Sequence, residues 1–255
     1  MPKRLYQTVR SEQMVPGGRR LALEFRADVE RLPAILLLPE GRTPTSAALL
    51  LHGYTSRKEH MSDTVGEALL HCGVASLAID LPLHGERSGS IEPMSVTNPL
   101  DVARRWRAAL AECSLALGYL GARREVDGGR LAIVGYSLGS FLAVIVAARE
   151  PRVRAVALAA GGDLPEGTPF SKLIRTVADP LRAVRRLSGR PLLMVNGRWD
   201  RTIRPADAER LFAEAGEPKE LRWWDAGHRL PPAAIADAAE WLASQLESGR
   251  HAASQ

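Results

Sequence analysis

The stretch from Leu131 to Arg149, LAIVGYSLGSFLAVIVAAR, constrains the fold of this chain more than any other. A short apolar run, 131–134, stops at a cluster of small residues, GYSLG, at 135–139. A longer apolar segment without glycine or proline follows the cluster. This order predicts a buried strand, a sharp turn and a buried helix.

The residue at the apex of the predicted turn, Ser137, is the first candidate for a catalytic role. A tight strand-to-helix turn strains the backbone of its apex residue, and Gly135 and Gly139 remove side chains that would clash there. Ser137 also begins the helix, where free N–H groups and the positive end of the dipole favour a developing negative charge. An accidental turn in a glycine-rich chain is the alternative, and the flanking strand and helix favour a nucleophile.

Strands and helices alternate along the rest of the chain. Two antiparallel strands are predicted at 21–27 and 33–39, and further strands at 47–51, 74–79, 153–160, 191–196 and 220–224. Helices are predicted at 59–72, 100–124, 205–215 and 232–247. This alternation is typical of an α/β fold with a mostly parallel central sheet and helices on both faces. Ligands in such sheets bind beyond the carboxyl ends of the strands, where the candidate polar residues lie.

The length of 255 residues allows one α/β domain, predicted at 1–247, with a flexible tail at 248–255. The segment 164–190 joins two strands with more residues than a crossover needs. It carries helical patterns at 172–178 and 181–187, separated by Pro180. It forms either a plain crossover helix with a loop or, the reading we favour, a small lid over the site.

Composition indicates a soluble cytoplasmic protein without a nucleic-acid or membrane partner. The net charge of +5 comes mostly from arginines interleaved with acidic residues and without an aromatic stacking platform, which favours solvated helix faces over a nucleic-acid surface. The N-terminus lacks the apolar core of a signal peptide, and the apolar runs 35–38 and 141–148 are too short to cross a bilayer. Cys72 and Cys113 show no metal-ligand spacing and suit a reducing compartment.

A serine hydroxyl needs a base that is itself oriented by an acid. His228 is the candidate base, because it follows the last predicted strand in a loop made flexible by Gly227. Asp200, after the preceding strand, is the favoured acid, and Asp163 is its rival. Of the other histidines, His52 and His84 are expected to order loops, and 60, 71 and 251 are expected at the surface or in the tail.

Acyl transfer also needs N–H donors directed at the oxyanion. The backbone N–H of Leu138, directly after the nucleophile, is one predicted donor of the oxyanion hole. The backbone N–H of Tyr54 is the other, because the turn at 52–53 ends a neighbouring strand at the same sheet edge. The ring of Tyr54 either lines the substrate pocket or covers the core.

Six motifs, PAILLLPEG, LHGYTSRKEHM, DLPLHGERSG, GYSLG, NGRWD and DAGH, together resemble serine esterases of the α/β-hydrolase superfamily, similar to its dienelactone hydrolase-like and acylpeptidase-like members. The resemblance runs from about Arg19 to Leu246, and it implies the chain order Ser137, Asp200, His228. Two departures matter: a dienelactone hydrolase carries cysteine as nucleophile, and the peptidases carry an N-terminal propeller that this sequence lacks. The resemblance therefore implies the fold and ester hydrolysis, and it says little about the substrate.

The sequence thus predicts a carboxylesterase-type serine hydrolase with a Ser137, Asp200, His228 triad, acting through an acyl-enzyme on an ester of a small or medium acyl group. No cofactor and no metal are expected, and the expected partner is the small-molecule ester, with the oligomeric state left open. Thioesterase, amidase or peptidase, acyltransferase and perhydrolase activities on the same triad are alternatives, and a non-catalytic binding module of the same fold is a further one. Arg182, Arg185 and Arg186 in the possible lid either form a solvated helix face, the interpretation we favour, or favour anionic substrates.

Overall fold

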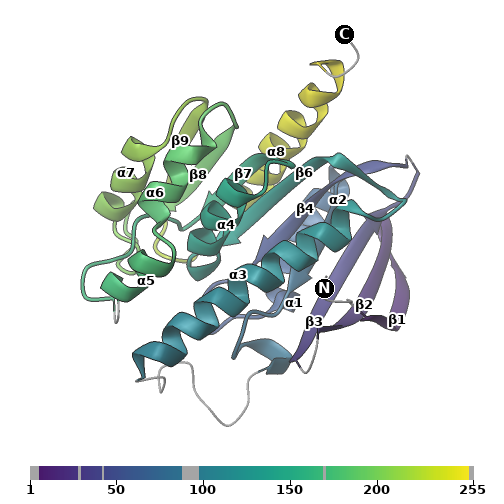
Figure 1. Cartoon of the computed structure of the whole chain (residues 1–255). Helices are drawn as coiled ribbons and strands as arrows, with labels where there is room; N and C mark the ends of the chain where they lie inside the picture. Colours follow the sequence, from purple (N-terminus) through teal and green to yellow (C-terminus); the bar gives the residue numbers. More distant parts are fainter. Residues whose placement is uncertain (1–5, 28–29, 42, 88–97, 169–170, 253–255) are drawn as a thin grey trace.

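The structure is a computed structural model that describes residues 6–27, 30–41, 43–87, 98–168 and 171–252. Within these ranges nine strands form one sheet in the order β1-β2-β3-β5-β4-β6-β7-β8-β9 (Figure 1). The strands are β1 (Tyr6–Val15), β2 (Gly18–Ala27), β3 (Glu30–Pro39), β4 (Thr45–Leu51), β5 (Ala75–Ile79), β6 (Val126–Tyr136), β7 (Val153–Ala159), β8 (Leu192–Gly197) and β9 (Lys219–Trp224). Strands β1, β2, β3 and β5 pair antiparallel, and all pairs from β5 to β9 are parallel. The predicted α/β class with a mostly parallel sheet is confirmed.

Helices connect the parallel strands. They are α1 (Lys58–Met61), the π-turn η1 (Ser62–Gly66), α2 (Glu67–His71), the 3₁₀ turn η2 (Gly85–Arg87), α3 (Pro99–Gly121), α4 (Leu138–Arg149), α5 (Ser171–Val177), α6 (Pro180–Val184), the 3₁₀ turn η4 (Arg185–Leu187), α7 (Pro205–Glu214) and α8 (Pro232–Ala252). The start of α3 is set by Pro99 in its first turn and by Asn98, whose side chain accepts a hydrogen bond from the Leu100 N–H. None of the described helices is both long and apolar enough to cross a membrane.

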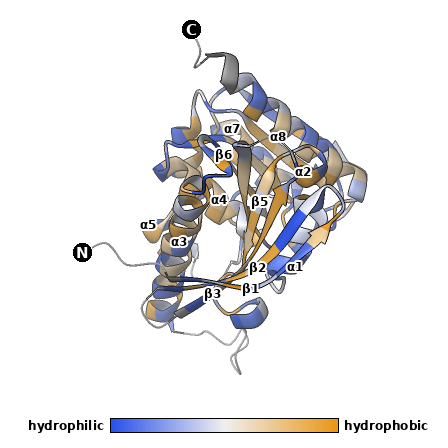
Figure 2. Cartoon of the chain, turned by 90° about the vertical axis from the view of Figure 1, so that its right-hand side faces the viewer, coloured by the Kyte–Doolittle hydropathy of each residue, from blue (hydrophilic) through white to orange (hydrophobic). Residues whose placement is uncertain are grey.

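Successive residues of the central strands face opposite sides of the sheet, which divides the core in two. In β4, Leu49 and Leu51 belong to the cluster that also contains residues of α3, α4, α6 and α7. Ala48 and Leu50 belong to the cluster on the other face, with residues of α1, α2 and α8. Hydrophobic residues accordingly gather in the strands and on the helix surfaces turned toward them (Figure 2). The buried sheet is the rigid support for the loops at its carboxyl edge.

Strand β1 is the element that the sequence interpretation missed. Residues 7–14 of β1 are all exposed, and the strand pairs only with β2 at the edge of the sheet. An edge strand without a buried face has no alternating hydrophobic pattern, and that pattern is the signal by which strands are predicted. Its position matters below, because Arg10 of β1 reaches a loop of the site.

The predicted helices differ from the structure mainly in their bounds. The predicted helix 59–72 consists of α1, η1 and α2 in succession, with one π turn inside it. The last helix was predicted to end at Glu247, whereas α8 continues to Ala252. The final residues 253–255 of the predicted tail lie outside the described ranges.

The segment 164–190 contains two parts with different packing. Helix α6 packs against α4 and α7, as a crossover helix does. Helix α5 packs against α3, and Ile174 on α5 joins Phe141, Leu164 and Ile203 in a small apolar cluster. A lid role for this segment stays a prediction.

Candidate active site

Ser137 lies between the end of β6 and the start of α4, in the turn that the sequence predicts. Its backbone has φ 51° and ψ −113°, a left-handed conformation of the kind that costs a non-glycine residue about 1–3 kcal/mol. Glycine is required on both sides of Ser137. A Cβ on Gly135 would lie 2.3 Å from the Gly139 carbonyl oxygen, and a Cβ on Gly139 would lie 2.1 Å from the Leu51 carbonyl oxygen. The close packing of β6, α4 and β4 therefore fixes Ser137 in this conformation.

The side chains of Ser137, His228 and Asp200 form one hydrogen-bonded chain beyond the ends of β6, β9 and β8. His228 Nε2 lies 3.0 Å from Ser137 Oγ, and His228 Nδ1 lies 2.7 Å from Asp200 Oδ2. The N–H groups of Thr202 and Ile203 donate to Asp200 Oδ1 at 2.7 and 3.0 Å, which leaves Oδ2 for the histidine. Because an ionised carboxylate only accepts, Nδ1 carries the proton and Nε2 can accept the hydrogen bond of the serine hydroxyl.

Asp163, the rival acid, lies in a different environment. Arg175 donates to both of its carboxylate oxygens, at 2.8 and 2.9 Å, and the Leu164 N–H donates to Oδ1 at 2.8 Å. Arg210 approaches Oδ2 from α7 at 3.5 Å. Asp163 is thus occupied in joining the end of β7 to α5 and α7, and the structure brings Asp200 to the imidazole instead.

Tyr136 is a residue of this site that the sequence interpretation missed. Its hydroxyl donates to the His228 carbonyl oxygen at 2.6 Å and accepts from the Leu230 N–H at 3.0 Å. Burial raises the pKa of the Tyr136 phenol, so the group stays protonated at neutral pH. The strand that carries Ser137 therefore also holds the loop that carries His228. The position of Tyr136 directly before Ser137 was the only signal in the sequence for this role.

The turn after β4 passes directly against Ser137. A Cβ built on Gly53 would lie 3.3 Å from the Ser137 Cβ, and Tyr54 follows Gly53. His52, which is fully buried, braces this turn as predicted: its Nδ1–H donates to the Gly53 carbonyl at 2.7 Å, and its Nε2 accepts from the Leu81 N–H at 3.0 Å. Burial lowers the pKa of His52 to about 4, so the ring is neutral and keeps both bonds at neutral pH.

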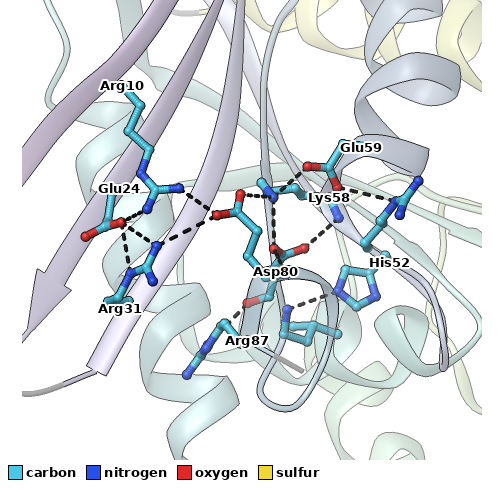
Figure 3. Close-up of polar contacts among 11 residues, drawn as sticks. Arg10, Glu24, Arg31, His52, Lys58, Glu59, Asp80 and Arg87 are labelled. Atoms are coloured by element: carbon cyan, nitrogen blue, oxygen red, sulfur yellow. Dashed lines mark hydrogen bonds and ion pairs between the residues drawn. The ribbon is translucent and has the colours of Figure 1, made fainter. Parts of the chain in front are cut away.

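A buried ion pair joins the loops after β4 and β5 (Figure 3). Asp80 accepts from the Lys58 N–H at 2.8 Å, from Lys58 Nζ at 3.0 Å and from the Glu86 N–H at 3.0 Å. Lys58 Nζ also donates to Glu86 at 2.7 Å. We call Lys58, Asp80 and Glu86 the clamp. It fixes the loop with Tyr54 to the loop with His84, and both loops border the site.

Acidic neighbours compensate the burial of the clamp lysine, whose side chain is 3% exposed. Burial alone would lower the pKa of Lys58, but hydrogen bonds to Glu59, Glu86 and Asp80 raise it above its ordinary value. The clamp continues outward through ion pairs from Glu86 to Arg10 and Arg31, which in turn contact Glu24 (Figure 3). The antiparallel strands β1 to β3 thereby support a loop of the site.

A cavity of about 160 Å³ lies next to the turn that carries Ser137. Tyr54 and Leu138, the two predicted oxyanion residues, line it on this side. Residues 81–84 and one face of α3 line it on the other, and apolar atoms dominate its surface. His84 belongs to this wall: its Nδ1–H donates to the Pro82 carbonyl at 2.8 Å, in keeping with the loop-ordering role predicted for it.

The arginines of the segment 164–190 lie away from this cavity. Arg182, Arg185 and Arg186 do not line it, and Arg185 pairs with Glu214 of α7 instead. Among the described residues, no group of three or more His, Cys, Asp or Glu side chains is placed to hold a metal ion.

Known proteins resemble this chain in sequence and in structure. Esterase YjfP of Escherichia coli K12 is 26% identical over 250 residues, covering 84% of this chain and 96% of that protein. The crystal structure of acetyl xylan esterase 1 from Thermoanaerobacterium matches with a TM-score of 0.77 at 18% identity, covering 96% of this chain and 89% of that one. The acetyl xylan esterase from Paenibacillus matches with a TM-score of 0.74 at 20% identity, with the same coverage of 96% and 89%.

The structural matches show the fold, which is that of the α/β hydrolases, as the sequence resemblance implied. A family model described as the alpha/beta hydrolase family matches residues 48–250. The matched range begins within β4 and contains every residue of the site described above. On this match over most of its length, the chain belongs to the alpha/beta hydrolase family.

Proposed function

We propose that this protein is a serine carboxylic ester hydrolase in which Ser137 is the nucleophile, His228 the general base and Asp200 the residue that orients the base. The observation that carries the proposal is the continuous hydrogen-bonded chain from Ser137 Oγ through His228 to Asp200, at 3.0 and 2.7 Å. The Escherichia coli relative YjfP is named an esterase, which supports esters as the substrate class.

In the first half-reaction Ser137 Oγ attacks the ester carbonyl carbon while His228 Nε2 accepts the hydroxyl proton. The imidazolium that forms is stabilised by Asp200, whose carboxylate is held by two backbone N–H groups. His228 then gives its proton to the leaving alcohol, which departs as the acyl-enzyme forms. Asp200 stays ionised throughout, because its part is to orient and to compensate charge.

The developing oxyanion needs donors, and the amides of Leu138 and Tyr54 are proposed for this role. Leu138 is the first residue of α4, so its N–H has no partner within the helix. Tyr54 follows Gly53, which packs against Ser137. Tyr54 and Leu138 both line the adjoining cavity. Each such donor contributes roughly 10² to 10³ in rate.

In the second half-reaction a water molecule attacks the acyl-enzyme with His228 again as the base. The acid is released, and the proton returns to Ser137 through His228. The neutral state of His228 between the two steps requires that Nδ1 keep its proton toward Asp200.

A serine-directed fluorophosphonate tests the proposal directly. We expect one equivalent to label Ser137, and we expect Ser137→Ala to abolish both labelling and ester hydrolysis, with kcat reduced by about 10⁶-fold. Ser188→Ala, which changes an exposed serine on the surface, is the matched control and should behave as the wild type. Labelling at another position, or ester hydrolysis that survives in Ser137→Ala, would refute the proposal.

A further inference from the structure

The cavity beside Ser137 is placed to receive the acyl part of the substrate. In the proposed mechanism the leaving alcohol must lie near His228 Nε2, because His228 protonates it. Neither His228 nor Asp200 lines the cavity, whereas Tyr54 and Leu138 do. With the oxyanion at those two amides and the alcohol toward His228, the group on the carbonyl carbon extends into the cavity.

The size of the cavity limits this group. An apolar cavity of about 150 Å³ in another protein accommodates benzene, which has six carbon atoms. The volume here is about 160 Å³. An acyl group that fills this cavity therefore has about six non-hydrogen atoms beyond the carbonyl carbon.

One charged side chain, Arg105, contributes to the wall of this apolar cavity. It lies on α3 at helical spacing from Val102 and Ala109 and next to Trp106, and all three of these apolar residues line the same cavity. Arg105 Nε is buried without a hydrogen-bond partner. The Arg105 side chain is half-buried, and an anion bound in this cavity would give its guanidinium the acceptor that Nε lacks.

The neighbouring arginines differ from Arg105 in having partners. A second cavity, of about 580 Å³, is lined by Arg31, Arg87, Arg104 and Arg105. Arg31 pairs with Glu24, Arg87 with Glu112 and Arg104 with Asp101. Glu86, which also lines this cavity, pairs with Lys58, Arg10 and Arg31. Within the described part of the chain, Arg105 is the only one of the four arginines that makes no ion pair. Arg105 lines both cavities, as Pro82 and Leu83 do, so its charge lies where the two cavities adjoin.

We propose that the substrate is a half-ester of a short aliphatic dicarboxylic acid, whose free carboxylate binds Arg105 while the ester carbonyl lies at Ser137. This inference rests on the proposed function. Arginine suits the role because its planar guanidinium pairs with a carboxylate through two parallel hydrogen bonds. The reaction consumes one water: the bond from the carbonyl carbon to the alcohol oxygen breaks, and a dicarboxylate, an alcohol and one proton are released.

Two ethyl esters of matched shape test this inference. Monoethyl glutarate carries a terminal carboxylate, and ethyl 5-methylhexanoate carries an isopropyl group of the same shape in its place. Ethanol is a poor leaving group, which suppresses attack by the substrate's own carboxylate, and the released proton is followed by pH-stat titration at pH 7.5. The readout is the ratio of kcat/KM for the two esters.

We expect kcat/KM of the wild type to be about 10- to 100-fold higher for monoethyl glutarate than for the neutral ester, because one charge-assisted hydrogen-bonded pair provides a preference of this size. In Arg105→Met the ratio should fall by a similar factor, with kcat/KM for the neutral ester rising as an apolar side chain replaces the cation. Arg105→Lys, which keeps the charge without the planar fork, should retain part of the preference. Arg104→Met, the neighbouring exposed arginine that pairs with Asp101 and does not line the acyl cavity, is the control and should keep the wild-type ratio.

Failure of this inference can be told from failure of the proposed function. If Ser137 is labelled and the neutral ester is hydrolysed, but the wild type shows no preference or Arg105→Met keeps it, the inference is wrong and the esterase stands. If neither ester is hydrolysed and no serine is labelled, the proposed function fails. Thermal melting shows whether Arg105→Met is folded; should it not fold, the wild-type ratio and Arg105→Lys decide the question.

Discussion

The two sides of the site are held together in different ways. On the serine side, the loops after β6, β8 and β9 bring Ser137, Asp200 and His228 into contact through their own side chains. On the clamp side, the loops after β4 and β5 are joined by Asp80, which accepts hydrogen bonds from two backbone amides and from Lys58 Nζ. The clamp lines no part of the acyl cavity.

The serine side therefore carries out the reaction, whereas the clamp holds the loops of the site in place. Substitutions on the serine side should reduce kcat and leave the fold intact, because each side chain serves the reaction. Substitutions in the clamp should reduce the free energy of unfolding, because they leave buried donors without acceptors. Each prediction below tests whether a residue belongs to the side to which the structure assigns it.

Among the substitutions that test this comparison, the largest effect is expected at Asp200. In Asp200→Asn the amide can donate as well as accept, so it no longer selects the tautomer with the proton on His228 Nδ1. The ring can then carry its proton on Nε2, which cannot accept the serine proton, and kcat should fall by about 10⁴-fold. Asp163→Asn, at the end of the adjacent strand, is the matched control. It weakens the buried pairing with Arg175 and should lower the unfolding free energy while kcat stays close to wild type. Kinetics with a short-chain ester and urea denaturation measure both, and a larger loss of kcat in Asp163→Asn would reverse the assignment.

A large loss of stability, without such a loss of kcat, is expected at Asp80. Both of its oxygens accept from N–H donors, so the amide nitrogen of Asp80→Asn would face a donor in either orientation. Breaking a buried pair in this way costs about 3–5 kcal/mol of unfolding free energy. Asp63→Asn is the control, because Asp63 makes an exposed pair with Arg20, worth at most about 1 kcal/mol. Equal losses for the two variants in urea denaturation would show that the clamp is not a stabilising unit.

A pH-dependent effect is expected at His52 on the same side. Its folded-state pKa of about 4 lies below the ordinary value of 6.5, so the unfolded chain binds the proton more tightly. The contribution of His52 to the free energy of unfolding is therefore fully present above pH 6.5. It is lost as the pH falls toward 4, and the loss amounts to at most about 3 kcal/mol. Glutamine does not titrate, so the free energy of unfolding of His52→Gln, measured with urea, should fall less between pH 7 and pH 4.5 than that of the wild type. Parallel pH dependences would argue against a buried neutral His52.

The sequence predicted the serine side better than the clamp side for a physical reason. Ser137, Asp200 and His228 each follow a strand in a short motif, so local pattern and the geometry of a parallel sheet are enough to place them at one edge. Asp80 and Lys58 are ordinary residues whose pairing depends on how β4 and β5 lie side by side. Both lie in motifs that carry the family resemblance, but no local pattern shows that they pair with each other. No local pattern marks β1 either, whose exposed residues support Glu86 through Arg10.

The smallest effect is expected at Tyr136, which belongs to the serine side without taking part in proton transfer. Tyr136→Phe keeps the ring and leaves the His228 carbonyl and the Leu230 N–H without their partner. The loop that carries His228 then loses its anchor on β6, and since small displacements of a catalytic group are costly, kcat should fall by about tenfold with little change in KM. Tyr119→Phe, which removes from α3 a hydroxyl that accepts a hydrogen bond from Arg123, should keep wild-type kcat. If Tyr136→Phe is folded and equally active, the position of His228 is set by Asp200 alone, and the serine side depends on fewer contacts than the structure indicates.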